Sequence, residues 1–236
     1  MTPIVLFDLD DTLIDYSAGT ESSWREACAA VGAPAGLDEE ALARALLDAR
    51  RWFWDDPLRH RRERVDMLAA WTKIAVRALD QLGAPGPALA AALAEDYATR
   101  RSSAHYLFPD ALGTLARLRA AGARLAMVTN GDKRFQREKI DRFALAPYFE
   151  AIVIEGEFGV GKPDASVYRH VLAALGVAPR AAIMVGDHLD NDVAGAQAVG
   201  IHGIWLDRGG LGLPAGCGVR PDRIIAALTD LDRAAG

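Results

Sequence analysis

The stretch Ile4-Val5-Leu6-Phe7-Asp8-Leu9-Asp10-Asp11-Thr12 decides the fold, because a short apolar run ends abruptly in an acidic cluster. Four apolar residues closed by polar ones are typical of a buried strand in a parallel sheet. Far along the chain, Ala182-Ile183-Met184-Val185 has the same pattern and precedes Gly186-Asp187-His188-Leu189-Asp190-Asn191-Asp192. Ligands bind beyond the carboxyl ends of parallel strands, so both acidic clusters are predicted to meet there. Carboxylates this close repel each other, and a bound divalent cation offsets that repulsion.

After residue 110 the chain alternates between segments typical of helices and segments typical of strands. The predicted strands cover residues 124–128, 151–154, 182–185 and 203–206, with a last short strand and helix within 223–231. The predicted helices cover residues 111–121, 133–143, 166–175 and 193–199. Such alternation predicts an α/β fold with a Rossmann-like, three-layer core, in which helices cover both faces of a parallel sheet.

Residues 15–105 differ from the rest, because they lack the alternation that strands require. Four helices are predicted there, at residues 21–31, 38–54, 62–83 and 87–102. Since the first strand must join the sheet of the core, this helical block is an insertion that leaves after the first strand and returns near residue 105. We therefore predict two domains: an α/β core of residues 1–14 and 106–236, and an all-helical domain of residues 15–105.

Composition and charge narrow the class of protein. The chain has 236 residues, of which 51% are hydrophobic, and a formal net charge of −5. That acidic balance argues against nucleic-acid binding, because such surfaces are usually basic. No apolar stretch approaches the roughly 20 residues of a membrane span, and no signal pattern precedes Ile4, so we expect a cytoplasmic protein without membrane contact. Cys28 and Cys217 lie far apart in the sequence, which favours free thiols over a disulfide.

Two further polar segments follow predicted strands. Thr129-Asn130-Gly131 ends the second strand of the core, and Gly161-Lys162-Pro163-Asp164 follows the third. Taken singly, each segment is more typical of an ordinary turn than of a binding site. Taken together with the two acidic clusters, four successive strand ends each deliver a polar group to the same edge of the sheet. A shared site explains that order better than four unrelated turns.

This set of motifs resembles the haloacid dehalogenase superfamily of phosphotransferases. That family combines DxDxT, a Thr or Ser at the end of the next strand, a Lys, and GDxxxxD. The corresponding segments here are Asp8 to Thr12, Thr129, Lys162, and Asp187 to Asp192. The motifs are specific for the superfamily and say little about the substrate.

The resemblance extends over the whole predicted core, residues 1–14 and 106–236. The helical block resembles the all-helical cap that one branch of the superfamily inserts after the first strand. Tyr16 and Ser17 after the first motif, together with residues 159–164, are similar to the nucleotidase and N-acylneuraminate-9-phosphatase group.

The resemblance implies a Mg²⁺-dependent phosphatase that hydrolyses a small-molecule phosphate monoester through an aspartyl-phosphate. Asp8 would be the nucleophile, and Asp10 would protonate the leaving alkoxide and then deprotonate the attacking water. Mg²⁺ prefers oxygen ligands, which would be Asp8, the backbone carbonyl of Asp10, and Asp187. The phosphoryl group would be held by Thr129, Asn130, Gly131 and Lys162. Thr12 would support the turn, and Asp192 would either bind the metal or, as we favour, orient its ligands.

The run from Arg50 to Arg62 is the most distinctive part of the helical block, because it combines five arginines with three aromatic residues. In one interpretation Trp54, Arg59 and His60 recognise the part of the substrate that is not phosphate. In the other, the aromatic residues pack the helical domain and the arginines are solvated. The run also suits a contact with a partner subunit, and we expect a monomer or a homodimer. A closing cap favours small soluble substrates over phosphoproteins.

Three alternatives stay open. A sugar phosphomutase of the same superfamily would bind its phosphorylated intermediate again and return an isomer. A haloacid dehalogenase is disfavoured by Asp10, because that reaction has no alkoxide leaving group to protonate. A non-catalytic binding protein is compatible with the fold, although none of the catalytic groups is missing.

Overall fold

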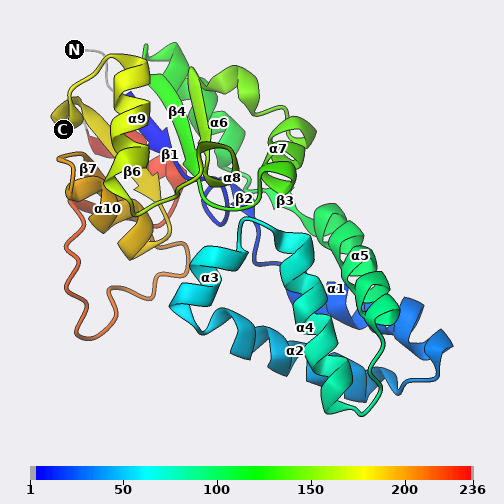
Figure 1. Ribbon diagram of the computed structural model, residues 1–236. Coiled ribbons are helices and arrows are strands. Elements are labelled where there is room, and N and C mark those ends of the chain that lie inside the picture. The colour runs from blue at the N-terminus through cyan, green and yellow to red at the C-terminus, as the bar shows by residue number, and fades with distance from the viewer. Residues whose placement is uncertain (1–3, 235–236) are drawn as a thin grey trace. The chain divides into compact units, whose positions relative to one another are not determined.

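The computed structural model describes residues 4–234, and the chain divides into two compact units (Figure 1). One unit comprises Met1–Tyr16 and Tyr106–Gly236, and the other comprises Ser17–His105. Residues 1–3 and 235–236, which we assigned to the core, lie outside the described residues.

The first unit is built on a six-stranded sheet with β1 (Ile4–Phe7) near its centre, in the order β5-β4-β1-β6-β7-β8. The other strands are β4 (Arg124–Thr129), β5 (Ala151–Ile154), β6 (Ala182–Gly186), β7 (His202–Leu206) and β8 (Arg223–Ile225). Every neighbouring pair in this sheet is parallel, so the carboxyl ends of all the strands lie at one edge. The predicted α/β, Rossmann-like core is confirmed.

The register of the central strands aligns the segments that follow them. Phe7 pairs with Met127 of β4 on one side and with Val185 of β6 on the other. The backbone N–H of Asp8 donates to the carbonyl oxygen of Val185 at 3.0 Å. The first acidic cluster therefore begins where three neighbouring strands end together.

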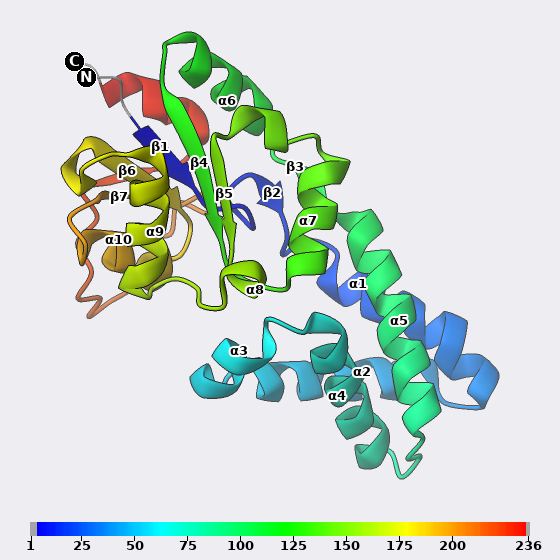
Figure 2. The same ribbon diagram turned by 45° about the horizontal axis from the view of Figure 1, so that its top comes forward.

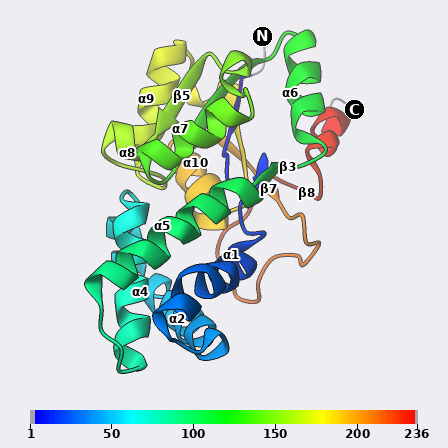
Figure 3. The ribbon, with the colours of Figure 1, turned by 90° about the vertical axis from the view of Figure 1, so that its right-hand side faces the viewer.

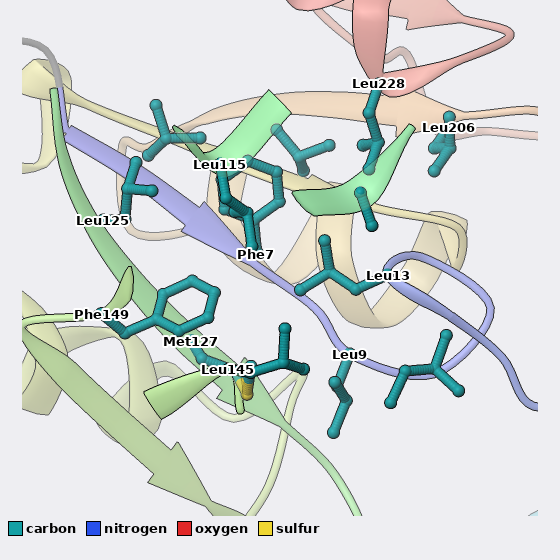
Figure 4. Packing of buried hydrophobic residues seen from close by; sticks show 14 of the residues in the cluster. Phe7, Leu9, Leu13, Leu115, Leu125, Met127, Leu145, Phe149, Leu206 and Leu228 are labelled. Atoms are coloured by element: carbon teal, nitrogen blue, oxygen red, sulfur yellow. The ribbon is translucent and has the colours of Figure 1, made fainter. Parts of the chain in front are cut away.

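The sheet is buried on both faces, which explains why β1 is continuously apolar. Val5 and Phe7 belong to one hydrophobic cluster, and Ile4 and Leu6 belong to another. The first cluster, seen from close by in Figure 4, includes residues of α6 (Ala111–Ala120) and α7 (Lys133–Arg142). The second includes residues of α9 (Ala165–Leu175) and α10 (Gly195–Gln197), and Figure 2 shows α9 and α7 on opposite sides of β4 and β5. Each large apolar side chain buried in this way contributes roughly 1.5–3 kcal/mol.

Shorter elements complete the first unit. Helix α8 (Glu155–Phe158) directly follows β5, and a π-helical turn (Leu189–Ala194) leads into α10. Short 3₁₀ helices cover Ala146–Tyr148, Pro179–Ala181 and Leu228–Ala234. A separate antiparallel pair joins β2 (Ile14–Asp15) to β3 (Tyr106–Leu107), the two segments through which the chain leaves and re-enters this unit.

The second unit is helical throughout (Figure 3). Its helices are α1 (Thr20–Ala27), α2 (Glu39–Trp54), α3 (Pro57–Glu63), α4 (Met67–Gln81) and α5 (Pro87–Ala104), with a π-helical turn (Cys28–Gly32) and a 3₁₀ turn (Ala33–Ala35) after α1. Helix α4 packs against α2 and α5, and α1 packs against α5. The rings of Trp24 and Tyr97 stack with their centroids 3.8 Å apart, and Trp71 meets Tyr97 edge-on at 5.1 Å.

Two predicted helices differ from the structure. The single helix expected at residues 62–83 is wrong, because α3 ends at Glu63 and α4 begins at Met67. The carboxylate of Asp66 accepts a hydrogen bond from the backbone N–H of Ala69, as an N-cap residue does, and so starts a new helix. The helix expected at residues 193–199 begins earlier, with the turn at Leu189.

The remaining expectations concern thiols and the membrane. Cys28 and Cys217 are both free, as expected, and burial raises the pKa of the Cys28 thiol to about 12. Within residues 4–234, no helix combines the length and the apolar character that crossing a bilayer requires.

Candidate active site

Asp8 is the first residue after β1, and the residue is almost fully buried at 7% exposure. The hydroxyl of Thr12 lies 3.4 Å from Asp8 Oδ2, a long hydrogen bond across the turn. Asp11 adopts a left-handed backbone with φ of 56°, and its carboxylate accepts a hydrogen bond from the N–H of Tyr16. The guanidinium of Arg208 donates to the carbonyl oxygen of Thr12 at 2.8 Å. These contacts fix the loop that carries the first acidic cluster.

Lys162 connects the two acidic clusters. Its Nζ lies 2.6 Å from Asp8 Oδ1 and 2.6 Å from Asp192 Oδ1, and the side chain is 2% exposed. Burial alone lowers the pKa of a lysine, but the charges of Asp192 and Asp8 outweigh it and raise the pKa of Lys162. The other oxygen of Asp192 accepts a hydrogen bond from the backbone N–H of His188 at 3.0 Å. Asp192 therefore holds both the lysine and the turn that carries Asp187.

Asp187 completes a cluster of three carboxylates. Oxygen atoms of Asp8, Asp187 and Asp192 all lie within 4.8 Å of one another. The indole N–H of Trp205 donates to the carbonyl oxygen of Asp187 at 2.7 Å and holds the loop in place. The predicted convergence of Asp8, Lys162 and Asp187 at one edge of the sheet is present in the structure.

The carboxylate cluster fits a divalent cation. Burial, and then the neighbouring charges of Asp8 and Asp192, raises the pKa of Asp187 to about 9. Burial raises the pKa of Asp8 to about 7, because it outweighs the nearby Lys162. One ammonium is too little positive charge for three ionised carboxylates, and a divalent cation would supply the rest. The ligand atoms are all carboxylate oxygens, which Mg²⁺ prefers.

The segment after β4 is held by the side chain of Asn130 and by Glu155 of α8. Asn130 accepts a hydrogen bond from the N–H of Lys162 at 2.7 Å and donates to its carbonyl oxygen at 2.8 Å. The N–H of Gly131 donates to the buried carboxylate of Glu155 at 2.9 Å. Gly131 has φ of 117°, a conformation that glycine adopts readily. The side chain of Asn130 therefore positions Lys162. Thr129, the last residue of β4, is buried, and its hydroxyl oxygen lies 2.6 Å from Gln136 Nε2.

The carboxylate of Asp10 is held by two side chains of helix α7. Lys139 Nζ lies 2.5 Å from Asp10 Oδ1 and 2.7 Å from Oδ2, and Gln136 Nε2 lies 3.0 Å from Oδ2. Lys139, Gln136 and Glu155 are site residues that sequence reasoning missed. Gln136 and Lys139 fall three residues apart on the buried face of α7, beside Ile140. Polar residues on a buried helical face need partners, and that pattern was the available signal.

The three residues of the helical unit that were predicted to recognise the substrate, Trp54, Arg59 and His60, have different surroundings. Trp54 contacts the ring of His60 edge-on, with centroids 5.3 Å apart. The guanidinium of Arg59 lies 3.9 Å from the ring centroid of Trp52, and Arg59 Nε donates to the carbonyl oxygen of Phe53 at 2.6 Å. A cavity of about 700 Å³ between α2, α3 and α4 is lined by Arg59 and by the half-exposed Trp52. Trp54 and His60 are not among its lining residues.

Comparison with known proteins gives consistent results. The haloacid dehalogenase-like hydrolase family matches residues 2–200. A phosphoserine phosphatase of Thermus thermophilus is 35% identical over 227 residues, covering 87% of this chain and 89% of that protein. The N-acylneuraminate-9-phosphatase of Rattus norvegicus is 27% identical over 246 residues, covering 96% and 91%.

Among solved structures, the HAD-hydrolase YfnB of Bacillus subtilis bound to magnesium matches with a TM-score of 0.77. The match covers 98% of this chain and 97% of that one, at 21% identity. At that level of identity the likeness concerns the fold alone.

Proposed function

The chain belongs to the haloacid dehalogenase-like hydrolase family, and from this premise we propose that it is a Mg²⁺-dependent phosphatase that hydrolyses a small-molecule phosphate monoester through an aspartyl-phosphate. One observation carries the proposal. The buried carboxyl of Asp8 is paired with Lys162, lies within 4.8 Å of oxygens of Asp187 and Asp192, and stands two residues before a second carboxylate, Asp10.

The relatives support a phosphatase of small molecules over the other chemistries of the family. Both relatives compared above are named as phosphatases, and each aligns over more than four fifths of its length. Hydrolysis of a phosphate ester requires a group that protonates the leaving alkoxide, and Asp10 is a carboxyl group suited to that role. The substrate class we propose is a small phosphorylated metabolite with an alcohol or acid function.

The metal ligands we propose are the side chains of Asp8 and Asp187 and the backbone carbonyl of Asp10. Asp192 forms an ion pair with Lys162 and accepts a hydrogen bond from the N–H of His188. Its role in the proposal is therefore to orient the metal ligands, not to be one of them. When bound, Mg²⁺ supplies positive charge against the phosphoryl oxygens and the carboxylates.

In the first step, a carboxylate oxygen of Asp8 attacks phosphorus, and the bond from phosphorus to the ester oxygen breaks. Asp10 transfers a proton to the departing alkoxide, which leaves as the alcohol. The products are the alcohol and a phosphorylated Asp8. The hydroxyl of Thr129 and the ammonium of Lys162 hold the phosphoryl oxygens, with the backbone of Asn130 and Gly131 shaping the loop.

In the second step, water attacks the phosphorus of the aspartyl-phosphate. Asp10 accepts a proton from that water, and the bond from phosphorus to the Asp8 oxygen breaks. Free phosphate leaves, Asp8 returns as a carboxylate, and Asp10 is again protonated. Atoms and charge balance, and each carboxyl returns to its starting state.

The helical unit is proposed to act as a cap that selects the substrate, with Trp54, Arg59 and His60 contacting the part that is not phosphate. Because Arg59 is also bonded to the backbone of Phe53, it serves the packing of the unit as well. Arg59→Ala is expected to raise KM for the preferred metabolite about tenfold and to leave p-nitrophenyl phosphate nearly unaffected. Leu58→Ala, at a neighbouring residue that is 80% exposed, is the matched control. Equal effects of the two substitutions would remove Arg59 from the proposal.

The activity is tested with purified protein, Mg²⁺ and p-nitrophenyl phosphate. Phosphate release is expected, and Asp8→Asn should abolish it because the nucleophile is lost. Asp141→Asn, at an exposed aspartate of the same unit, should leave the rate unchanged. Hydrolysis that survives Asp8→Asn would refute the mechanism.

A screen of phosphorylated metabolites then identifies the substrate. It should include phosphoserine, N-acylneuraminate 9-phosphate, nucleoside monophosphates, sugar phosphates and phosphoglycolate. Isomerised sugar phosphate without free phosphate would indicate a mutase. Release of halide from a haloacid would indicate a dehalogenase, and metal binding without any turnover would indicate a binding protein. That the protein acts in the cytoplasm, as a monomer or homodimer, stays a prediction from the sequence.

A further inference from the structure

The carboxylate of Asp10 is gripped by two side chains of helix α7. Lys139 contacts both of its oxygens, at 2.5 and 2.7 Å, and Gln136 contacts Oδ2 at 3.0 Å. Lys139 and Gln136 are both buried, whereas Asp10 is partly open to solvent. Because the two residues are three apart on one helix, they face the same side.

Gln136 also reaches the last residue of β4 and the residue that follows it. Its Nε2 lies 2.6 Å from the hydroxyl oxygen of Thr129 and 2.9 Å from the carbonyl oxygen of Asn130, as well as near Asp10. An amide nitrogen carries two hydrogens, so these three acceptors share them. One side chain therefore ties the carboxyl proposed to move protons to the residue proposed to hold the phosphoryl group.

Lys139 is 4% exposed although it carries a charge. Ile140, the next residue, already fills the hydrophobic cluster beneath α7. Burying an ammonium is costly unless it is paired, and the partner that compensates Lys139 is Asp10. The Lys139 Nζ also lies 4.5 Å from the ring centroid of Tyr16, whose face attracts a cation. The charge of Lys139 is thus directed at Asp10 from a rigid helix.

The contacts distinguish the two oxygens of Asp10. Oδ2 accepts from both Lys139 and Gln136, which occupies its two lone pairs. Oδ1 accepts from Lys139 alone and keeps one lone pair for a proton.

We propose that Lys139 and Gln136 are positioning residues that fix the carboxyl group of Asp10, so that Oδ1 exchanges the proton with the leaving oxygen and then with water. This inference rests on the proposed phosphatase function and deepens it. Rigid placement of a proton donor matters most when the leaving group is a poor one, because a good leaving group departs without protonation.

The test compares two aryl phosphates, phenyl phosphate and 2,4-dinitrophenyl phosphate, whose leaving groups differ in basicity. Lys139→Met is expected to lower kcat for phenyl phosphate about 10- to 100-fold more than for the dinitrophenyl ester, with KM changed less than about twofold. Lys139→Arg should recover part of the loss, because it keeps the charge. Lys133→Met, at an exposed lysine of the same helix, should match the wild type.

A double-mutant cycle isolates the dependence on Asp10. In an Asp10→Asn background, Lys139→Met should cost little more, because the group that it positions is already gone. Gln136→Leu should shift the leaving-group preference in the same direction by about 3- to 10-fold, and it serves as the second variant if Lys139→Met does not fold. Equal losses on both esters, or an undiminished loss in the Asp10→Asn background, would overturn the inference.

Failure of the inference and failure of the proposed function give different results. A wild-type protein that hydrolyses neither ester contradicts the phosphatase proposal itself. If the wild type hydrolyses both esters, and Lys139→Met and Gln136→Leu keep the wild-type ratio of rates on the two esters, only the role of Lys139 and Gln136 is contradicted.

Discussion

The protein freed of divalent cations should lose stability as the pH rises. Burial raises the pKa of Asp8 from 3.8 to about 7, despite the opposing effect of Lys162. Burial and then the charges of Asp8 and Asp192 raise the pKa of Asp187 from 3.8 to about 9. Both carboxyls therefore hold protons in the folded protein at pH values where the unfolded chain has released them, and folding stability falls wherever the folded state binds more protons.

The magnitude follows from the number of protons. One proton of difference changes the free energy of unfolding by about 1.4 kcal/mol per pH unit. Two carboxyls contribute from about pH 4 to 7, and Asp187 alone continues to about pH 9. Because they share one cluster, their effects do not add in full, and we expect a fall of about 1–2 kcal/mol per pH unit between pH 5 and 7. Against a typical total of about 5–15 kcal/mol, that change is large.

Carboxylates in other ion pairs do not obscure this fall in stability, because they titrate at lower pH. Ion pairs lower the pKa of Glu63, Glu150 and Glu157 below the usual 4.5. A lowered pKa gives stability that is lost only as the pH falls through that range, so these groups contribute little above pH 5.

Urea unfolding in EDTA at pH 5, 6, 7 and 8 measures the slope, and the same series in Mg²⁺ measures the rescue. Stabilisation by Mg²⁺ should grow with pH, since its ligands bind in the deprotonated form. Asp187→Asn removes one of the two titrating groups and should give a shallower slope in EDTA. A flat profile in EDTA, or a slope that Asp187→Asn leaves unchanged, would refute the reasoning.

Two further predictions concern the packing of the same cluster. Lys162→Met removes the ammonium that lies 2.6 Å from both Asp8 and Asp192. It should lower the free energy of unfolding by about 3–5 kcal/mol at pH 7 and by less at pH 5, because protonated carboxyls need no cation. Urea unfolding at the two pH values measures the difference. Gly186→Ala would place a methyl group 2.2 Å from Asp192 Oδ2, so it should break the contact of Asp192 with Lys162 and lower both stability and phosphatase activity. The control is Gly218→Ala, which meets open space and should be neutral in the same two assays.

The placement of Asp8, Lys162 and Asp187 could be predicted from the sequence, because each follows a short apolar segment. A parallel sheet brings the carboxyl ends of such segments to one edge, whatever their distance in the chain. The sequence does not show which residues of β1 face which side of the sheet, since a strand buried on both faces is apolar throughout. The prediction of an insertion rests on a separate argument: a strand at residue 4 can join a sheet that resumes after residue 110 only if the intervening helices form a block of their own.

The partners of Asp10 could not be predicted in this way. Lys139 is 129 residues from Asp10 in the sequence, and it lies within a helix and not at the end of a strand. Predicting that helix at residues 133–143 did not reveal which face is buried. The role of Asn130 was also hidden, because an Asn before Gly suits a turn, a phosphate ligand and a side-chain bridge equally well. Only the structure shows that its amide is taken up by the backbone of Lys162.

The two aspartates of the first motif differ because the fold compensates their charges differently. Asp8 shares one ammonium, Lys162, with Asp192, and Asp187 lies beside them, so three carboxylates face a single positive charge. That deficit is what a divalent cation would remove. Asp10, only two residues away, has Lys139 to itself and needs no further cation. Its carboxylate is therefore free of the proposed metal and available for the proposed proton transfer, so one short segment would supply both the proposed nucleophile and the proposed acid–base group.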